Sequence, residues 1–194
     1  MNDRVFSHAH AHKLEDPDRL RWLPPAQVLA ALELRDGMRV ADIGAGTGYF
    51  ALPIANSLGQ SGHVYAVDLQ PEMLAKLEKK LQGSGESNVS LHQGDAGRVP
   101  LPDACCDRVL FANLWHEIPD HEAAVKEAIR LLAPQGRIAI LDWRADIDSP
   151  PGPPKDIRIS AQTVCEFLKQ HGCGKASMLP IGEYSYIVTA QLSR

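Results

Sequence analysis

The sequence predicts an α/β fold in which a mostly parallel sheet is covered by helices on both faces. Segments with the pattern of strands alternate with segments that have the pattern of amphipathic helices along most of the chain. A glycine-rich turn joins the first strand to the helix that follows it. The length of 194 residues suits one well-buried domain and is too short for two ordinary ones, so we expect a single domain over residues 1–194.

Prolines and glycines mark the boundaries of the elements in the first half. Proline is tolerated in the first turn of a helix, so we expect helices to start at Pro24-Pro25 and at Pro71. Gly83-Ser84-Gly85 ends the second of these helices, in which apolar residues recur at helical spacing. The expected elements are a helix at 24–34, a turn at 35–37, a strand at 38–43, a helix at 49–58, a strand at 63–68 and a helix from 71 to the glycines at 83–85.

The second half continues the alternation and ends in two strands. Asp120 is a suitable cap for a helix that extends to Leu132. The proline-rich stretch 148–154 cannot form regular structure, and we expect an ordered loop there. The expected elements are strands at 89–93 and 108–112, a helix at 120–132, a strand at 137–143, a helix near 160–171 and strands near 176–179 and 184–191.

Composition and charge disfavour several classes of function. A hydrophobic fraction of 44% and a charged fraction of 23% are those of a soluble globular protein, and no apolar run approaches the ~18 residues of a membrane span. The polar, histidine-rich start is not a secretory signal. A net charge of −4 leaves no basic footprint for nucleic acid. The cysteines show no CxxC pairing, so we expect a reducing cytoplasm; they are Cys105, Cys106, Cys165 and Cys173.

The spacing of the glycine-rich turn discriminates between cofactors. The segment VADIGAGTGYF at 40–50 has the pattern G-x-G-x-G at Gly44, Gly46 and Gly48, with Asp42 ahead of it. Glycine is needed where the backbone bends sharply and a ligand approaches it without an intervening Cβ. A dinucleotide fingerprint, G-x-G-x-x-G, would require glycine at Tyr49. The spacing therefore disfavours an oxidoreductase with a nucleotide cofactor.

Two acidic residues follow at the ends of the next two predicted strands. Asp68 ends the second strand, 20 residues after Gly48, and Asp95 follows the third. Ligands of open α/β sheets lie beyond the carboxyl ends of the strands, where a carboxylate can accept hydrogen bonds from ribose hydroxyls or meet an adenine amine. Each feature alone could be structural, Asp68 as a helix cap and Asp95 in a polar turn. Their order at consecutive strand ends favours the binding interpretation.

These segments resemble the class I methyltransferases that use S-adenosylmethionine, in particular small bacterial types without an assigned substrate. The resemblance extends from about Leu23 to Gln191 and rests on the segments ADIGAGTGYF, VYAVDLQPEML, QGDA, LPDACCDRVLFANLWHEI and LLAPQGRIAILDW. It implies a Rossmann-like, doubly wound sheet of seven strands, mostly parallel and with antiparallel pairing at the C-terminal end. It also implies S-adenosylmethionine as the cofactor, a cover segment at 1–22 and a core at 23–194.

The resemblance further implies a set of cofactor-binding residues. They are Asp42, Gly44, Ala45, Gly46, Gly48, Asp68, Leu69, Asp95, Ala96, Asn113 and Leu114. The glycine turn would line the methionine and ribose portion, and Asp42 would orient the turn or meet the amino group through water. Asp68 would bind the ribose hydroxyls, and Leu69 would pack on the adenine, whose edge the pair Asp95-Ala96 would hold. Asn113 or Leu114 would contact the methionyl end.

The best candidates for catalysis are His116 and Glu117, which follow the fourth predicted strand. Methyl transfer from a sulfonium is an in-line displacement, and it needs a base only if the acceptor must lose a proton. His116 would accept that proton or position the substrate, and Glu117 would orient His116. The structural alternatives are a hydrogen-bonded lid residue and the start of a polar turn. Asp142-Trp143-Arg144 closes the fifth strand and faces the same expected cleft.

Two further clusters, one of histidines and one of cysteines, do not indicate a metal or arsenic site. His8, His10 and His12 lie on one side of an extended chain, but no fourth metal ligand is identifiable, so we expect a disordered or substrate-covering tail and no metal site. Some relatives methylate arsenic bound by cysteine thiolates, which draws attention to Cys105 and Cys106. Both precede the fourth strand, where Cys106 fits a small core residue, so an arsenic site is not indicated.

The sequence therefore predicts an S-adenosylmethionine-dependent methyltransferase that acts on a small-molecule acceptor. The alternative is a module that binds the cofactor but has lost catalysis and serves as a sensor or partner subunit. A pocket open beside His116 would favour the enzyme, and a filled pocket would favour the module. A protein or RNA acceptor has no support from an added recognition domain or a basic stretch.

Overall fold

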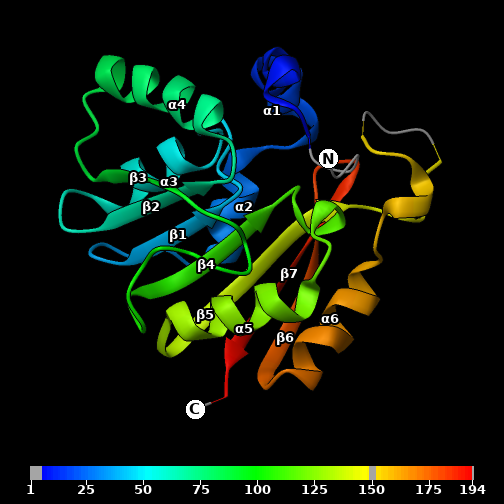
Figure 1. The fold of residues 1–194 in the computed structure, drawn as a ribbon. Coiled ribbons are helices and arrows are strands. Elements are labelled where there is room, and N and C mark those ends of the chain that lie inside the picture. The colour runs from blue at the N-terminus through cyan, green and yellow to red at the C-terminus, as the bar shows by residue number, and fades with distance from the viewer. Residues whose placement is uncertain (1–5, 149–151, 194) are drawn as a thin grey trace.

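The computed structural model describes residues 6–148 and 152–193, and they form one seven-stranded sheet with the strand order β3-β2-β1-β4-β5-β7-β6. The strands are β1 (Arg39–Ile43), β2 (His63–Asp68), β3 (Val89–Gln93), β4 (Cys106–Ala112), β5 (Leu132–Trp143), β6 (Cys173–Ile181) and β7 (Ser185–Leu192). The pairings from β3 through β5 are parallel, whereas β7 pairs antiparallel with both β5 and β6. This confirms the predicted fold (Figure 1).

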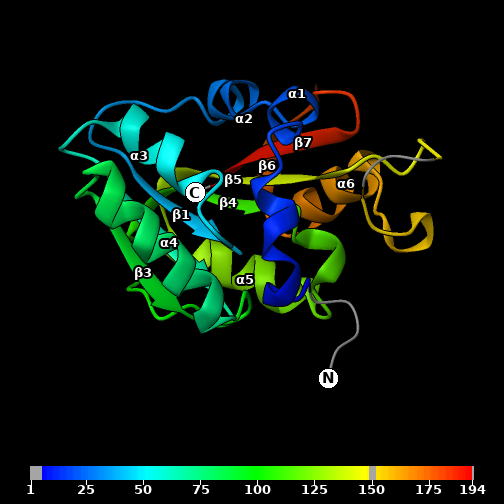
Figure 2. The ribbon, with the colours of Figure 1, turned by 90° about the horizontal axis from the view of Figure 1, so that it is seen from above.

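Helices cover both faces of the sheet and divide the core into two layers (Figure 2). One layer lies under α2, α3 and α4, and the other lies under α5 and α6. No helix in the described part of the chain is long and apolar enough to cross a membrane. The helices are η1 (His8–Glu15), α1 (Arg19–Trp22), α2 (Pro25–Leu32), α3 (Ala51–Leu58), α4 (Pro71–Ser84), η2 (Trp115–Glu117), α5 (His121–Leu131), η3 (Lys155–Ile157) and α6 (Ala161–Gln170), where η denotes a 3-10 helix.

Most predicted boundaries agree with the structure within a few residues, and β2 and β3 agree fully. Asp120 caps α5 as expected, since its side chain accepts a hydrogen bond from the amide of Ala123. β5 begins at Leu132 and not at Arg137, because the chain passes directly from α5 into a strand whose first residue pairs with Cys106. Residues 149–151 of the predicted proline-rich loop lie outside the described residues.

A cover segment formed by η1 and α1 lies above the carboxyl ends of the central strands (Figures 1 and 2). Glu15 at the end of η1 accepts hydrogen bonds from the hydroxyl of Thr47 and, at 2.7 Å, from Nζ of Lys80. Ahead of η1, the carbonyl of Phe6 accepts a hydrogen bond of 2.8 Å from Nε2 of Gln70. These contacts attach the cover segment to the glycine turn and to α4.

Candidate active site

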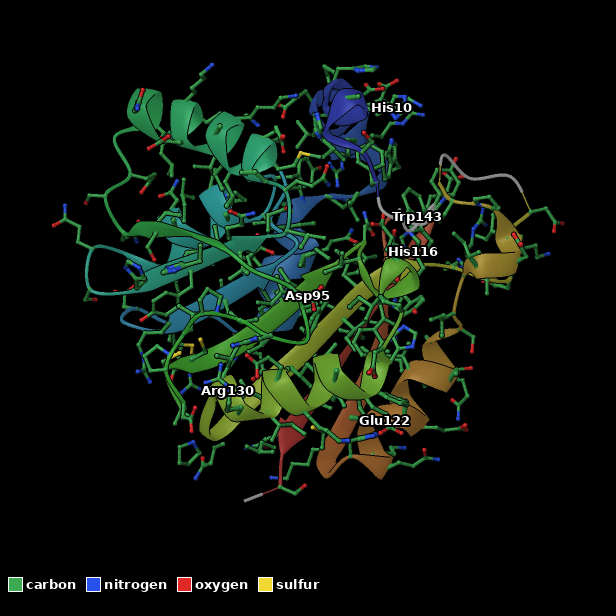
Figure 3. The ribbon with its side chains drawn as sticks, viewed as in Figure 1. His10, Asp95, His116, Glu122, Arg130 and Trp143 are labelled. Atoms are coloured by element: carbon green, nitrogen blue, oxygen red, sulfur yellow. The ribbon has the colours of Figure 1, made fainter. Side chains whose placement is uncertain are left out.

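A cavity of about 1160 Å³ lies between the cover segment and the carboxyl ends of the strands. Figure 3 shows His116 and Trp143 below the part of the cover segment that carries His10. The lining contains every predicted site residue except one: Asp42, Gly44, Ala45, Gly46, Asp68, Leu69, Asp95, Ala96, Asn113, Leu114, His116 and Glu117. The structure therefore brings the glycine turn, both acidic strand ends and the histidine to a single site.

The glycine turn is held against β2 by backbone hydrogen bonds, from the amides of Gly44 and Ala45 to the carbonyl of Val67. Gly44 has φ +75°, and a Cβ there would lie 2.8 Å from the side chain of Leu114. Gly46 also has a positive φ, of +54°. Both positions thus favour glycine, and they present bare backbone to the cavity.

Gly48 is the exception among the predicted cofactor-binding residues, because it does not line the cavity. It has φ +87°, and a Cβ there would lie only 2.3 Å from Cδ1 of Leu77 in α4. The third glycine of the pattern therefore allows α4 to pack closely on the turn. The structure corrects its expected role from ligand contact to packing.

Asp68 joins the glycine turn to the end of β2. Its Oδ2 accepts a hydrogen bond of 2.8 Å from the amide of Gly46, and its Oδ1 accepts one of 2.9 Å from the amide of Gln70. Burial raises the pKa of this carboxyl, and the backbone amides oppose the rise. Each carboxylate oxygen has a second lone pair, so Asp68 retains the capacity to accept two ribose hydroxyls. Leu69 beside it is 50% exposed, which leaves an apolar surface for a flat ring.

Asp42 is buried at the floor of the cavity, with 1% of its surface exposed. Neither of its carboxylate oxygens forms a hydrogen bond of normal geometry within the described residues. Burial, followed by the nearby charge of Asp68, raises its pKa to about 7, although the amide of Ala51 opposes the shift. Buried polar groups are normally hydrogen-bonded. An ammonium group of a ligand would supply the missing donors, so these residues fit S-adenosylmethionine.

His116 forms a buried pair with Asp142, a residue that sequence reasoning placed in the cleft without a role. Nδ1 of His116 lies 2.7 Å from Oδ1 of Asp142, and the amide of His116 donates a 2.9 Å hydrogen bond to Oδ2. Burial lowers the pKa of the imidazole, but the hydrogen bond and charge of Asp142 outweigh it and raise the pKa overall. One carboxylate therefore fixes both the backbone and the ring of His116.

Glu117 is also buried, and it connects the catalytic candidates to the cover segment. Its Oε1 lies 3.6 Å from Nε2 of His116, and its Oε2 accepts a 2.9 Å hydrogen bond from the amide of Phe6. Burial raises its pKa, whereas the Phe6 amide and the charge of His116 lower it. Glu117 is thus not the start of an exposed polar turn, which was the structural alternative.

The far wall of the cavity is aromatic. Trp143 at the end of β5 packs against Trp22 of α1, with ring centroids 5.3 Å apart. Arg19, on the same turn of α1, also lines the cavity and is buried. Neither Arg19 nor Trp22 was predicted, because four residues of helix in a polar segment carry no periodic signal.

Of the remaining clusters, the three histidines lie in the 3-10 helix η1 and not on an extended chain, and His10 lines the cavity. His8 donates its amide to Gln70, and His10 and His12 lie with ring centroids 6.4 Å apart. Across residues 6–148 and 152–193 no group of three or more potential ligands could hold a metal ion. All four cysteines are free and buried, and none lines the cavity. Cys106 is a core residue, as predicted.

Known proteins resemble this chain in sequence and in fold. The profile of a family described as "Methyltransferase domain" matches residues 34–179. A crystal structure of a SAM-dependent methyltransferase from Aquifex aeolicus superposes with a TM-score of 0.90 at 30% identity, over 97% of this chain and 100% of the other. The demethylmenaquinone methyltransferase of Geobacillus kaustophilus is 31% identical over 72% of this chain and 61% of its own length. The C-methyltransferase UbiE of ubiquinone and menaquinone biosynthesis in Vibrio vulnificus is 32% identical over 60% of this chain and 45% of its own length. The chain thus spans about half the length of these two curated relatives.

Proposed function

Because the chain belongs to the family described as "Methyltransferase domain", we propose that it transfers a methyl group from S-adenosylmethionine to a small organic acceptor. The observation that carries the proposal is the arrangement of one cavity. The glycine turn and Asp68 line the same cavity as His116, whose ring is held by Asp142.

The residues of the proposed cofactor site have separate tasks. Asp68 accepts hydrogen bonds from the ribose, and Gly44 and Gly46 let the ligand approach the backbone. Leu69 and the pair Asp95-Ala96 also line the cavity and would hold the adenine. When bound, S-adenosylmethionine supplies a methyl group on a positively charged sulfur, which is already reactive enough to be transferred. The protein contributes alignment and the exclusion of water, and the cover segment contributes to both.

The proposed role of His116 is to take a proton from the acceptor as the acceptor is methylated. Asp142 holds Nδ1 in its protonated form, which leaves Nε2 as the basic atom. A pKa raised by Asp142 makes that nitrogen a better base than free imidazole. Glu117, 3.6 Å from the same nitrogen, orients the ring and balances the positive charge that forms.

We propose a small, largely apolar and aromatic acceptor with an acidic proton. The walls that Trp22, Trp143 and Ile118 form suit a flat apolar molecule. Small-molecule pockets usually occupy ~300–1,000 Å³, so a cavity of about 1160 Å³ has room for the cofactor together with an acceptor. Two relatives carry names from menaquinone and ubiquinone biosynthesis, which supports this acceptor class.

Two further parts of the proposal concern catalysis and compartment. The cavity reaches His116 and is not filled there, which supports an enzyme over a cofactor-binding module that has lost catalysis. Four buried free cysteines, two of them adjacent with Sγ atoms 3.4 Å apart, support a reducing compartment such as the cytoplasm.

The first test is calorimetric titration with S-adenosylmethionine, S-adenosylhomocysteine and, as a control, NAD. We expect the first two to bind at micromolar concentration and NAD not to bind; absence of binding by both methionine cofactors would contradict the proposal. The second test is a screen of hydroxylated aromatic acceptors with methyl-labelled cofactor. On an acceptor that is methylated, His116→Ala should lower turnover far more than cofactor affinity, and equal loss of both would give His116 a structural role.

A further inference from the structure

Two buried side chains of opposite charge that line the cavity have polar atoms without a hydrogen-bond partner. Within residues 6–148 and 152–193, the charged side chains that have a buried nitrogen or oxygen without a hydrogen bond are Arg19 and Asp42. Both line the same cavity. The side-chain oxygen of Asn113 is a third such atom, and it lines the cavity as well. Unpaired buried charges are costly, so this coincidence indicates that a ligand supplies their partners.

Arg19 is held in place by the cover segment and the glycine turn together. Its guanidinium carbon lies 4.1 Å from the centroid of the Tyr49 ring, next to the glycine turn, and its Nη1 donates to the carbonyl of Leu14. Only 6% of the residue is exposed, and Nε has no acceptor. Burial lowers the pKa of Arg19 to about 10, so the side chain remains charged at neutral pH. The group is thus a cation that is held in place at the wall of the cavity.

A ligand that satisfies both groups must carry an anion and a cation a few atoms apart. An α-amino acid has this arrangement, with a carboxylate for a guanidinium and an ammonium for a carboxylate. We infer that Arg19 binds the α-carboxylate of the cofactor's methionine end, while Asp42 and Asn113 accept hydrogen bonds from its α-ammonium. This inference rests on the proposed function, and it adds Arg19 to the residues of the cofactor site.

The assignment gives the cover segment a role in cofactor recognition as well as in enclosure. Arg19 lies on α1, whereas Asp42 lies in β1 and Asn113 directly follows β4. A zwitterionic ligand end would therefore connect the cover segment to the sheet. A ligand without the carboxylate would lose the connection to α1 and keep its contacts with Asp42 and Asp68.

The test compares two ligands on three proteins by calorimetric titration. The ligands are S-adenosylhomocysteine and its decarboxylated analogue, which keeps the amine, the thioether and the nucleoside. The proteins are the wild type, Arg19→Gln and Arg21→Gln; Arg21 is exposed on the same short helix and does not line the cavity. Thermal unfolding of each protein without ligand shows whether the substitution alters folding.

We expect Arg19→Gln to weaken binding of S-adenosylhomocysteine by about tenfold or more and binding of the decarboxylated analogue by less than about twofold. Arg21→Gln should change neither affinity. Equal weakening of both ligands, or an unchanged affinity for S-adenosylhomocysteine, would overturn the assignment of Arg19 and leave the proposed function intact. If the wild type binds neither ligand, the proposed function fails and the assignment fails with it.

Discussion

His116 lies in η2, just beyond the carboxyl end of β4, and meets Asp142 near the carboxyl end of β5 through two hydrogen bonds, of 2.7 Å from the ring and 2.9 Å from the backbone amide. The register of the sheet produces this contact. Ala112, the last residue of β4, pairs with Leu141 in β5, so the chain beyond β4 turns directly past Asp142. Through this contact Asp142 raises the pKa of His116, and the pKa can be measured without a methyl acceptor.

Asp142→Asn should lower the pKa of His116. The hydrogen bond and charge of Asp142 raise the pKa in the wild type, while burial acts in the opposite direction and remains in the variant. The pKa of the imidazole should therefore lie above its ordinary value in the wild type and lower in Asp142→Asn, where the charge of Glu117 still acts to raise it. A pH titration of the His116 ring signals by NMR measures both values. An identical pKa in the two proteins would show that Asp142 does not control the ring.

Asp68→Ala should weaken binding of S-adenosylhomocysteine by ~2 kcal/mol or more, the expected loss for hydrogen bonds to a charged group. Asp68→Asn keeps only one side-chain oxygen, so it can accept from the amide of Gly46 or of Gln70 but not from both; thermal unfolding of each variant therefore separates disruption of the turn from loss of ribose contacts. Asp36→Ala, at an exposed turn before β1, is the matched control. Titration calorimetry decides the matter, and unchanged affinity in both Asp68 variants would remove Asp68 from the site.

The cofactor-free protein should lose stability as the pH rises from about 4 to 7 because of Asp42. In this range the unfolded chain releases the proton of Asp42, whereas the folded protein retains it, since burial raises its pKa to about 7. The folded state is then penalised by at most roughly 4 kcal/mol above pH 7. Asp42→Asn removes this contribution, so its stability should depend less steeply on pH than that of the wild type.

Urea unfolding of both proteins at several pH values measures this difference. Binding of S-adenosylhomocysteine near pH 6 should also release a proton, because the ligand's ammonium favours the ionised form of Asp42. Calorimetric titrations in buffers with different ionisation enthalpies detect that proton. Parallel stability profiles of wild type and Asp42→Asn would contradict the prediction.

Gly48→Ala should destabilise the protein by about 2–5 kcal/mol, whereas Gly85→Ala should cost only about 1–2 kcal/mol. Both glycines have a positive φ, but a Cβ at Gly48 would meet Leu77 at 2.3 Å, and a Cβ at Gly85 would meet nothing within 4 Å. Comparison of the two variants thus separates the energetic cost of close packing from the cost of backbone strain. Chemical denaturation measures both values, and equal values would mean that Leu77 adjusts without cost.

The sequence predicts those parts of the site that lie close together along the chain. The glycine turn is a local pattern, and Asp68 and Asp95 are recognisable because each ends a strand whose boundaries are clear. His116 was found by its position after β4 in the same way. In each of these cases, the position of a residue relative to its own strand is sufficient to predict that the residue lines the cavity.

The contacts between distant segments could not be predicted in this way. The pairing of His116 with Asp142 depends on the register of β4 against β5, which a single sequence does not encode as a local signal. Arg19 reaches the cavity because Glu15 and Phe6 attach the cover segment to α4 and η2. Gly48 was misassigned because a glycine in a ligand-binding pattern and a glycine in a helix-packing contact look alike along the chain.

The strand order reverses between β1 and β4, and this reversal divides the sheet residues that line the cavity into two stretches of the sequence. Apart from the cover segment, which contributes Arg19 and Trp22, the part of the lining proposed to hold the nucleoside comes from residues 42–97, and the part that contains His116 and Trp143 comes from residues 112–157. Substitution in the second stretch can therefore change the acceptor while the first stretch continues to hold the nucleoside. A chimera that keeps residues 1–112 of this chain and continues with a relative's sequence from the same point should acquire that relative's acceptor preference.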